Sequence, residues 1–339
     1  MGWLAIWDGR KLTHVARDAR RAELCEGTIR FEMHLRGDIQ APVILWQGRT
    51  GTARDLRVLA RPDGTVSFEH GTSIVETQPG FLLSGEPLHL HYSWSRLGRG
   101  GQLVLKNLQT GAESTTFLSA HAPRELAEIV PETPGPMLSV SYAGVANHAL
   151  PDIPLPGLDG AVKVATPDGP VPVARLGVGA KVLTRSGREQ TVRWIGKSER
   201  MARGSDAPVL LRAPYFGLFE DILVSRNQPL LLSGCEVEYL FGHEEVLAQV
   251  EDIRRAGAAR ISLAQPVVTL HHVLLDDHDC LMSGRSALAS NLLADVLAAE
   301  GKSTARLDQA DRQSAWPMID RPSAQAWLEM LSQNRPAAA

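Results

Sequence analysis

The feature that most constrains this chain is the alternation of apolar and polar residues, with a period of two, in short runs. Residues 28–35 alternate in this way, and residues 56–60 and 65–68 do so on either side of an Asp63-Gly64 pair. This period assigns alternate side chains to opposite faces of a strand, and an Asp-Gly pair between two such runs is typical of a hairpin. Because strand patterns recur about every ten residues, the first 150 residues predict an antiparallel β-sandwich.

A proline-rich stretch from Pro131 to Pro156 interrupts this pattern. Its prolines lack a backbone donor and fix φ, so we expect a stiff connector. Within this stretch, residues 137–142 are expected to form the last strand of the first domain. Strand patterns resume from 157 to 285, and helical patterns follow. In the first predicted helix, the apolar face runs from Leu288 to Leu297. The second predicted helix begins at Pro322, with Asp320 as its N-cap.

The sequence therefore predicts a mainly β chain with four parts. These are a β-sandwich at 1–150, the end of the proline-rich linker at 151–156, a second β-rich domain at 157–300, and a helical tail at 301–339.

Charge and cysteine content narrow the class of protein. Lys and Arg number 35 and Asp and Glu 38, a net charge of −3, which does not favour a nucleic-acid binder. No run of 18 apolar residues predicts a membrane span, and the N-terminus lacks the basic region of a cleavable signal peptide. Cys25, Cys235 and Cys280 are widely spaced and predict free thiols. We expect a cytoplasmic protein or one secreted without such a peptide, and the oligomeric state stays open.

Eight segments of the second domain follow one another in a distinctive order and spacing: Ala165-Thr166-Pro167-Asp168-Gly169, Val171 to Leu176, Val178 to Thr184, Val192 to Gly196, Leu211 to Ala213, Asp221 to Ser225, Tyr239 to Gly242, and Leu270 to Gly284. Together they resemble the Hint domain, the autoprocessing fold shared by inteins and the Hedgehog C-terminal segment, in its bacterial form, and this resemblance implies a horseshoe of strands. The first domain has a strand that ends at Trp94, a glycine turn and Gln109-Thr110-Gly111. This order resembles laminin-G or concanavalin-like domains and implies a sandwich of the jelly-roll type.

This resemblance implies a site for an N-to-S acyl shift. In the family, a Cys at the first residue of the domain attacks the preceding carbonyl, and a His three residues after a Ser or Thr assists the scissile amide. The register from Thr166 assigns the nucleophile position to Gly157, and the register from Ser225 assigns the histidine position to Gln228. Glycine has no side chain for attack, and glutamine does not transfer protons near neutral pH.

A shifted alignment does not restore the site. No Ser, Thr or Cys lies between Ser141 and Thr166, and no His lies between His148 and His243. No Asn followed by a nucleophile stands at the C-terminal splice position. We therefore expect a degenerate Hint domain, not an enzyme, that serves as a binding or structural module, with Ser225 and His278 as remnants of the site.

Two alternatives stay open. The first is autoprocessing by a non-standard route that uses His278 or Cys280. The second is carbohydrate binding by the sandwich, whose Trp3, Trp7, Trp46 and Trp94 would stack on sugar rings if they were exposed, although core positions are the commoner place for such residues. As a binding module, the N-terminal sandwich would take a glycan or a protein ligand.

The stretch 271–280 is rich in possible metal ligands. His271 and His272 fall on opposite faces of a strand, so they do not share a metal. Residues 276–279 predict the polar turn of a hairpin between 268–275 and 280–283, with His278 where the family has a His. Gly284-Arg285-Ser286-Ala287-Leu288 lacks the second glycine of a nucleophile elbow. We expect no metal site and no cofactor.

Overall fold

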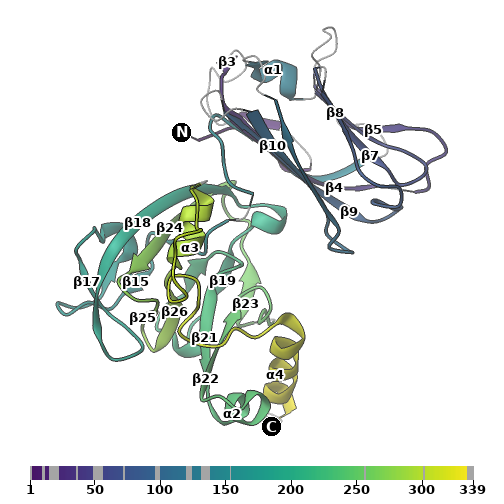
Figure 1. The fold of residues 1–339 in the computed structure, drawn as a ribbon. Coiled ribbons are helices and arrows are strands. Elements are labelled where there is room, and N and C mark those ends of the chain that lie inside the picture. The colour runs from purple at the N-terminus through teal and green to yellow at the C-terminus, as the bar shows by residue number, and fades with distance from the viewer. Residues whose placement is uncertain are drawn as a thin grey trace. The chain divides into compact units, whose positions relative to one another are not determined.

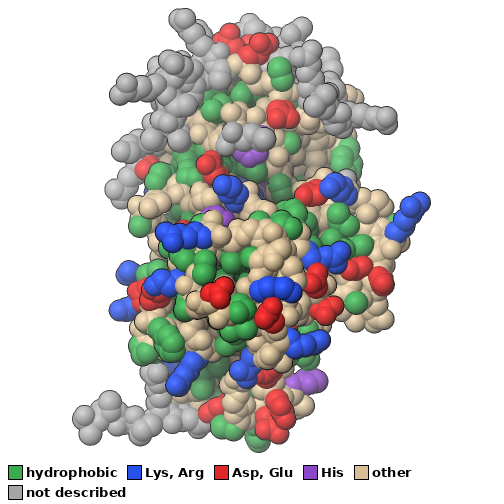
Figure 2. Space-filling view, turned by 90° about the vertical axis from the view of Figure 1, so that its left-hand side faces the viewer, with side chains coloured by type: hydrophobic (Ala, Val, Ile, Leu, Met, Phe, Trp, Pro, Cys, Tyr) green, Lys and Arg blue, Asp and Glu red, His purple; other side chains and the backbone are tan. Residues whose placement is uncertain are grey.

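The computed structural model divides the chain into two compact units, Met1–Asp152 and Ile153–Ala339 (Figure 1). None of its described helices is long and apolar enough to cross a membrane. On the face in Figure 2, the described Lys and Arg side chains lie among Asp and Glu side chains. The residues that the structure describes are 2–9, 12–14, 23–35, 37–48, 56–71, 73–95, 100–119, 124–130, 138–152, 154–255, 257–300 and 302–333.

The first unit is a β-sandwich. One sheet has seven strands in the order β11-β10-β9-β4-β13-β1-β2, and the other has four in the order β5-β6-β7-β8. Its elements are β1 (Trp3–Trp7), β2 (Leu12–His14), β3 (Glu23–Leu24), β4 (Gly27–Leu35), β5 (Val43–Gln47), β6 (Leu56–Ala60), β7 (Val66–His70), β8 (Ser73–Glu76), β9 (Pro87–Ser95), β10 (Gly100–Asn107), β11 (Glu113–Leu118), β12 (Arg124–Glu125), α1 (Leu126–Ile129) and β13 (Leu138–Ala146).

The alternating pattern selects the core of this sandwich. Ile29, Phe31 and Met33 point from β4 into the space between the two sheets, where all three are buried. Trp46 stacks on Phe31 with ring centroids 4.9 Å apart, and its Nε1 donates to the carbonyl of Ile129. The core interpretation of the tryptophans is therefore confirmed at Trp3, Trp46 and Trp94, which are buried; Trp7 is half-buried against the same core.

The two hairpin strands around Asp63-Gly64 are confirmed as well. β6 pairs antiparallel with β7, and the turn is closed by a hydrogen bond from the amide of Arg61 to the carbonyl of Thr65. Gly64 has φ +81°, a conformation that glycine adopts without a Cβ penalty. The predicted last strand is β13, whereas the prolines at 131, 134 and 136 lie outside the described residues.

The second unit is built from a seven-stranded sheet in the order β17-β18-β24-β14-β20-β19-β23 and a four-stranded sheet in the order β22-β21-β26-β25. Its elements are β14 (Leu158–Asp159), β15 (Lys163–Val164), β16 (Val171–Pro172), β17 (Lys181–Leu183), β18 (Glu189–Met201), β19 (Val209–Leu211), β20 (Ile222–Val224), β21 (Pro229–Ser233), α2 (Cys235–Phe241), β22 (Glu245–Gln249), β23 (Ala259–Ile261), β24 (Val267–Leu275), β25 (Cys280–Ser283), β26 (Ser286–Ala289), α3 (Leu293–Ala299) and α4 (Arg321–Gln333).

The predicted hairpin of 268–275 with 280–283 is wrong. β24 pairs with β18 and β14, and β25 pairs with β26. The turn between β24 and β25 is held by a buried carboxylate: Asp279 Oδ2 accepts from the hydroxyl of Ser186 at 2.6 Å and from Nε2 of Gln190 at 3.1 Å. These bonds tie the turn to the β17–β18 hairpin.

The first predicted helix begins later than its apolar stripe suggests, because Leu288 lies in β26 and α3 starts at Leu293. The second helix, α4, begins as predicted: the amide of Ser323 donates to Oδ1 of Asp320 at 3.0 Å. Ala324 and Trp327 on α4 are buried in the core of the unit. α4 therefore packs on the unit as part of its core.

Candidate functional site

The peptide between Pro156 and Gly157 lies where the chain enters β14, between β20 and β24. The amide of Gly157 donates to Oγ of Ser225 at 2.9 Å, and the amide of Ser225 donates to the carbonyl of Gly157 at 2.9 Å. Ser225 is buried, and the turn that follows β20 positions it. The structure thus places Ser225 against the residue to which the family register assigns the nucleophile.

The carbonyl of Pro156 accepts two hydrogen bonds from side chains. Nδ1 of His272 lies 2.7 Å from this oxygen, and Nδ2 of Asn291 lies 3.3 Å from it. Since a carbonyl oxygen only accepts, Nδ1 of His272 carries the proton. Nε2 of His272 lies 2.8 Å from Oγ of Ser198 and accepts from that hydroxyl when the ring is neutral.

Burial keeps this imidazole neutral. The pKa of His272 is lowered to about 4, mainly by desolvation and also by the charges of Arg200 and His271, while the bond to Pro156 opposes this shift in part. His272 therefore polarises the Pro156 carbonyl as a neutral donor at pH 7. Two donors on one carbonyl oxygen are half of an acyl-transfer site, the half that stabilises negative charge on that oxygen.

The other half, an attacking side chain, is absent from position 157, and the space for one is occupied. A Cβ added to Gly157 would lie 2.9 Å from Cε1 and 2.9 Å from Nδ1 of His272, and 3.0 Å from Cβ of Leu270. The imidazole cannot swing aside cheaply, because it is buried and bonded at both nitrogens. The arrangement therefore polarises a peptide carbonyl without supplying a nucleophile from residue 157.

Gln228, at the expected histidine position, is buried and bonded to the backbone. Its Nε2 donates to the carbonyl of Ala289 at 2.9 Å and to that of Pro229 at 3.2 Å. Its amide donates to the carbonyl of Ser225. None of these bonds reaches the Pro156–Gly157 peptide, and the side chain connects the start of β21 to β26.

His278 and Cys280 lie in the turn before β25 and at its start. Nδ1 of His278 accepts from the amide of Ala315 at 3.1 Å, and burial lowers the pKa of His278. Burial raises the pKa of the Cys280 thiol far above its ordinary value, and the carboxylates of Asp279 and Glu245 raise it further. A thiol in this environment stays protonated and is a poor nucleophile. No hydrogen bond among the described residues joins either side chain to the Pro156–Gly157 peptide.

Sequence reasoning missed His272 and Asn291 as part of this site. The available signal was strand parity, which puts His271 and His272 on opposite faces of β24. In the structure a Cβ on Gly160 would meet His271 at 2.9 Å, and a Cβ on Gly157 would meet His272. Parity separates the two histidines correctly, but only the pairing of β14 with β24 shows which of them reaches Pro156.

The two units are a β-sandwich and a fold of short paired strands whose first strand follows the Pro156–Gly157 peptide. Residues 158–293 match the family model described as the Hint domain, and the second unit contains a Hint domain. None of the curated proteins matches the chain.

Similar solved structures fall into two groups. The crystal structure of the MchDnaB-1 intein is 15% identical, with a TM-score of 0.26, and covers 40% of this chain and 99% of its own. The Ruminococcus gnavus IT-sialidase CBM40 bound to α2,3-sialyllactose is 12% identical, with a TM-score of 0.25, and covers 38% of this chain and 79% of its own. The Trypanosoma rangeli sialidase in complex with sialic acid is 13% identical, with a TM-score of 0.24, and covers 37% of this chain and 21% of its own.

Proposed function

We propose that this Hint domain does not cleave or splice itself. The Pro156–Gly157 peptide bond stays intact, and the domain serves as a stable structural module. The observation that carries the proposal is the occupation of the nucleophile space at Gly157 by the buried ring of His272. An N-to-S shift needs a thiol at residue 157 to attack the carbonyl of Pro156 as the amide leaves. Glycine supplies neither a thiol nor a hydroxyl.

The bonds of this peptide support the same role. The Pro156 carbonyl accepts from His272 and Asn291, and the Gly157 amide donates to Ser225. Each bond contributes about 0.5–1.5 kcal/mol to a folded structure. They connect the first strand of the Hint domain to β20, β24 and the segment after β26. The residues around the peptide therefore hold the start of the domain in place.

Intact-mass analysis of the purified full chain tests this proposal. After prolonged incubation between pH 5 and pH 9, with and without dithiothreitol or hydroxylamine, we expect one species of 36.8 kDa. Fragments that end at Pro156 or begin at Gly157 would overturn it. If such fragments form and Cys280→Ala abolishes them, the non-standard route through Cys280 is the correct one instead.

A second candidate function, carbohydrate binding by the sandwich, is favoured by one exposed aromatic ring. Phe117 is 79% exposed and lines a hollow of about 190 Å³ together with Ser93, Ser95 and Gln102. An aromatic face beside hydroxyl and amide groups is suited to a sugar ring, whose carbons stack while its hydroxyls bond.

A glycan array with the full chain tests this second function. We expect binding that Phe117→Ala removes, whereas Leu83→Ala, at another exposed apolar residue of the same unit, leaves it unchanged. The absence of binding to every glycan, with and without calcium, would refute it.

A further inference from the structure

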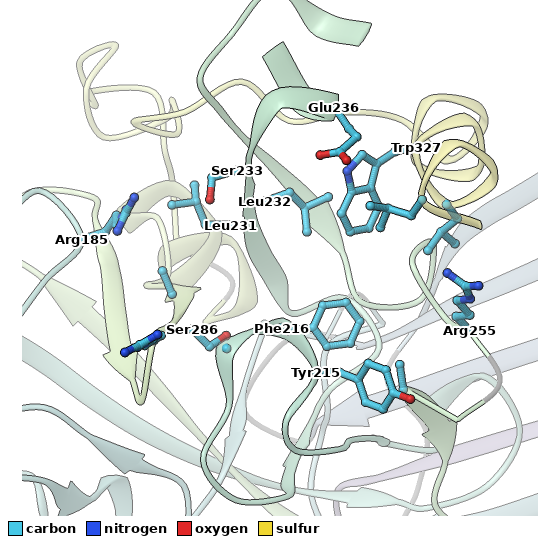
Figure 3. A pocket seen from close by; sticks show the side chains of 16 residues that line it. Arg185, Tyr215, Phe216, Leu231, Leu232, Ser233, Glu236, Arg255, Ser286 and Trp327 are labelled. Carbon is cyan, nitrogen blue, oxygen red and sulfur yellow. The ribbon is translucent and has the colours of Figure 1, made fainter. Parts of the chain in front are cut away.

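The second unit contains a cavity of about 570 Å³ on a side of the fold formed by β21, α4 and the turn Tyr215–Gly217. Figure 3 shows Leu232 and Trp327 on one side of this cavity and Tyr215 and Phe216 on the opposite side. The volume lies within the range of small-molecule sites, roughly 300–1,000 Å³. The residues around the Pro156–Gly157 peptide do not line it.

About half of the cavity wall is apolar. Leu231 and Leu232 come from β21, and Trp327, Leu328 and Leu331 come from one face of α4. Trp327 is 7% exposed and belongs to the core of the unit, so this wall is fixed by packing. A ligand that fills the cavity would gain about 25 cal/mol for each Å² of apolar surface that it removes from water.

One polar group inside the cavity lacks a partner. Ser286 lines the cavity and is 3% exposed, and its Oγ has no hydrogen-bond partner among the described residues. A buried hydroxyl without a partner costs the folded state about 1–3 kcal/mol. A ligand atom that accepts or donates a hydrogen bond at this point would remove that cost.

The charged side chains around the cavity are mainly positive. Arg185 lines it but is paired with Glu245, with Nε 2.7 Å from Oε1. Arg255 and Arg285 also line it, together with one carboxylate, Glu236. Both Arg285 and Ser286 line the cavity, where the Arg285 side chain is exposed and the Ser286 hydroxyl is buried. A guanidinium presents paired N–H donors that match a carboxylate.

The turn opposite α4 carries backbone strain. Phe216 has φ 56° and ψ 19°, the left-handed region that bulky residues rarely adopt. The next residue fixes this turn beside Arg285, because the amide of Arg285 donates to the carbonyl of Gly217 at 2.8 Å. Strain of this kind costs about 1–3 kcal/mol and concentrates at ligand sites, where it holds side chains in place.

We propose that this cavity binds an apolar molecule that carries a single carboxylate head. The apolar body lies between Leu232, Trp327 and Phe216, and the head bonds Arg285 and Oγ of Ser286. The site is separate from the residues around Pro156, and the proposal does not depend on whether the chain cleaves itself.

Three probes with the same alkyl chain and different heads test it: dodecanoate, dodecanol and dodecyltrimethylammonium, each below its micelle concentration. Isothermal titration calorimetry on the full chain measures their affinities. We expect dodecanoate to bind at least tenfold more tightly than dodecanol, and the cation most weakly. Equal affinity for all three, or no binding of dodecanoate, would overturn the proposal.

Variants locate the head. Arg285→Gln is expected to lower the affinity for dodecanoate about tenfold, because one charge-assisted hydrogen bond is lost. The affinity for dodecanol should not change. Arg175→Gln, at an exposed arginine of the same unit that does not line the cavity, is the matched control and should change neither affinity. Equal weakening by both variants would mean general attraction to a positive surface and would refute the site.

Ser286→Ala separates a binding role from a structural one. Since Oγ of Ser286 has no partner in the unliganded protein, its removal is expected to leave the melting temperature unchanged or to raise it. The same variant is expected to lower the affinity for dodecanoate several-fold. A lower melting temperature together with unchanged affinity would show that the hydroxyl serves the fold and would contradict the proposal.

Discussion

His272 donates a hydrogen bond of 2.7 Å from Nδ1 to the carbonyl of Pro156, a residue 116 positions earlier in the chain. The same ring fills the space in which a side chain at position 157 would stand. One residue therefore polarises the peptide that the family cleaves and also excludes the group that would attack it. Changes at Gly157 or His272 should therefore alter the stability of the second unit.

Because the His272 ring fills the space beside residue 157, a methyl group added at this position should destabilise the second unit. Gly157→Ala is expected to lower the free energy of unfolding of the second unit by about 1–3 kcal/mol, because its Cβ would lie 2.9 Å from a ring held by two hydrogen bonds. Urea unfolding checks this value. Gly177→Ala is the matched control, since no heavy atom lies within 4 Å of its added Cβ and its φ is not positive; it should change stability by less than about 0.5 kcal/mol.

A double-mutant cycle identifies the clash. If the ring of His272 causes the loss, Gly157→Ala costs much less in a His272→Ala background than in the native chain, an interaction energy of about 1 kcal/mol or more. Strictly additive effects of the two substitutions would contradict this account. They would place the strain on Leu270, whose Cβ is 3.0 Å from the added atom.

The lowered pKa of His272 predicts an acid-sensitive Hint domain. The ring has a pKa of about 4 in the folded state and about 6.5 when exposed, so the unfolded state binds more protons between these values. Stability is therefore full above pH 6.5 and falls as the pH drops to 4, by an amount on the order of 3 kcal/mol. Urea unfolding at several pH values measures it, and His272→Gln should flatten the curve in this window. An unchanged slope in that variant would be evidence against the assignment.

Local sequence patterns were sufficient for many elements of the fold. Alternation predicted β4 and β6, and the Asp-Gly pair predicted the turn before β7. Asp320 and Pro322 predicted the start of α4. These features depend on residues within a few positions of one another, where backbone preferences and period decide the conformation.

Strand pairing was harder to predict, because it is decided by residues far apart in the chain. The turn at 276–279 suggested that β25 returns onto β24, but the 13 residues of β18 occupy that edge of β24. Leu288 fitted a helical stripe because a short apolar strand next to a helix carries no distinct period. The family register assigned Gly157 and Ser225 to one site, and the structure joins them by two hydrogen bonds. The role of His272, in contrast, depends on a cross-strand neighbour that no local pattern specifies.

Asp279 and His278 are neighbours in the chain that we expect to contribute very differently to the stability of the second unit. Asp279 is 2% exposed, and its carboxylate accepts from Ser186, from Gln190 and from the amide of Cys280 at 2.7 Å. Asp279→Ala leaves these buried donors without an acceptor and is expected to cost about 3 kcal/mol or more of stability. His278→Ala removes a single acceptor and should cost less than about 1 kcal/mol. Thermal melts of both variants check the ranking, and a reversed order would show that His278 has a role beyond its bond to Ala315.

In the sandwich, Asp152 predicts a separate pH dependence. Its Oδ1 lies 3.6 Å from Nε2 of His89 and 3.9 Å from Nδ1 of His91, and its carbonyl accepts from Arg30. Burial raises the pKa of Asp152, but the close approach of His89 and the charge of Arg30 outweigh it and lower the value to about 2. The carboxylate thus stabilises the fold above its unfolded pKa of 3.8, and this contribution is lost as the pH falls towards 2.

Asp152→Asn is therefore expected to destabilise the first unit by about 2 kcal/mol at pH 7. The difference from the native chain should shrink as the pH drops from 4 to 2, since the native carboxyl is then protonated. Unfolding in urea at pH 7, 4 and 3 measures both effects. Asp38→Asn, at an exposed carboxylate of the same unit, is the control and should leave stability unchanged at every pH. An Asp152→Asn loss that stays constant down to pH 2 would mean that hydrogen-bond geometry, and not the charge, stabilises the cluster with His89 and His91.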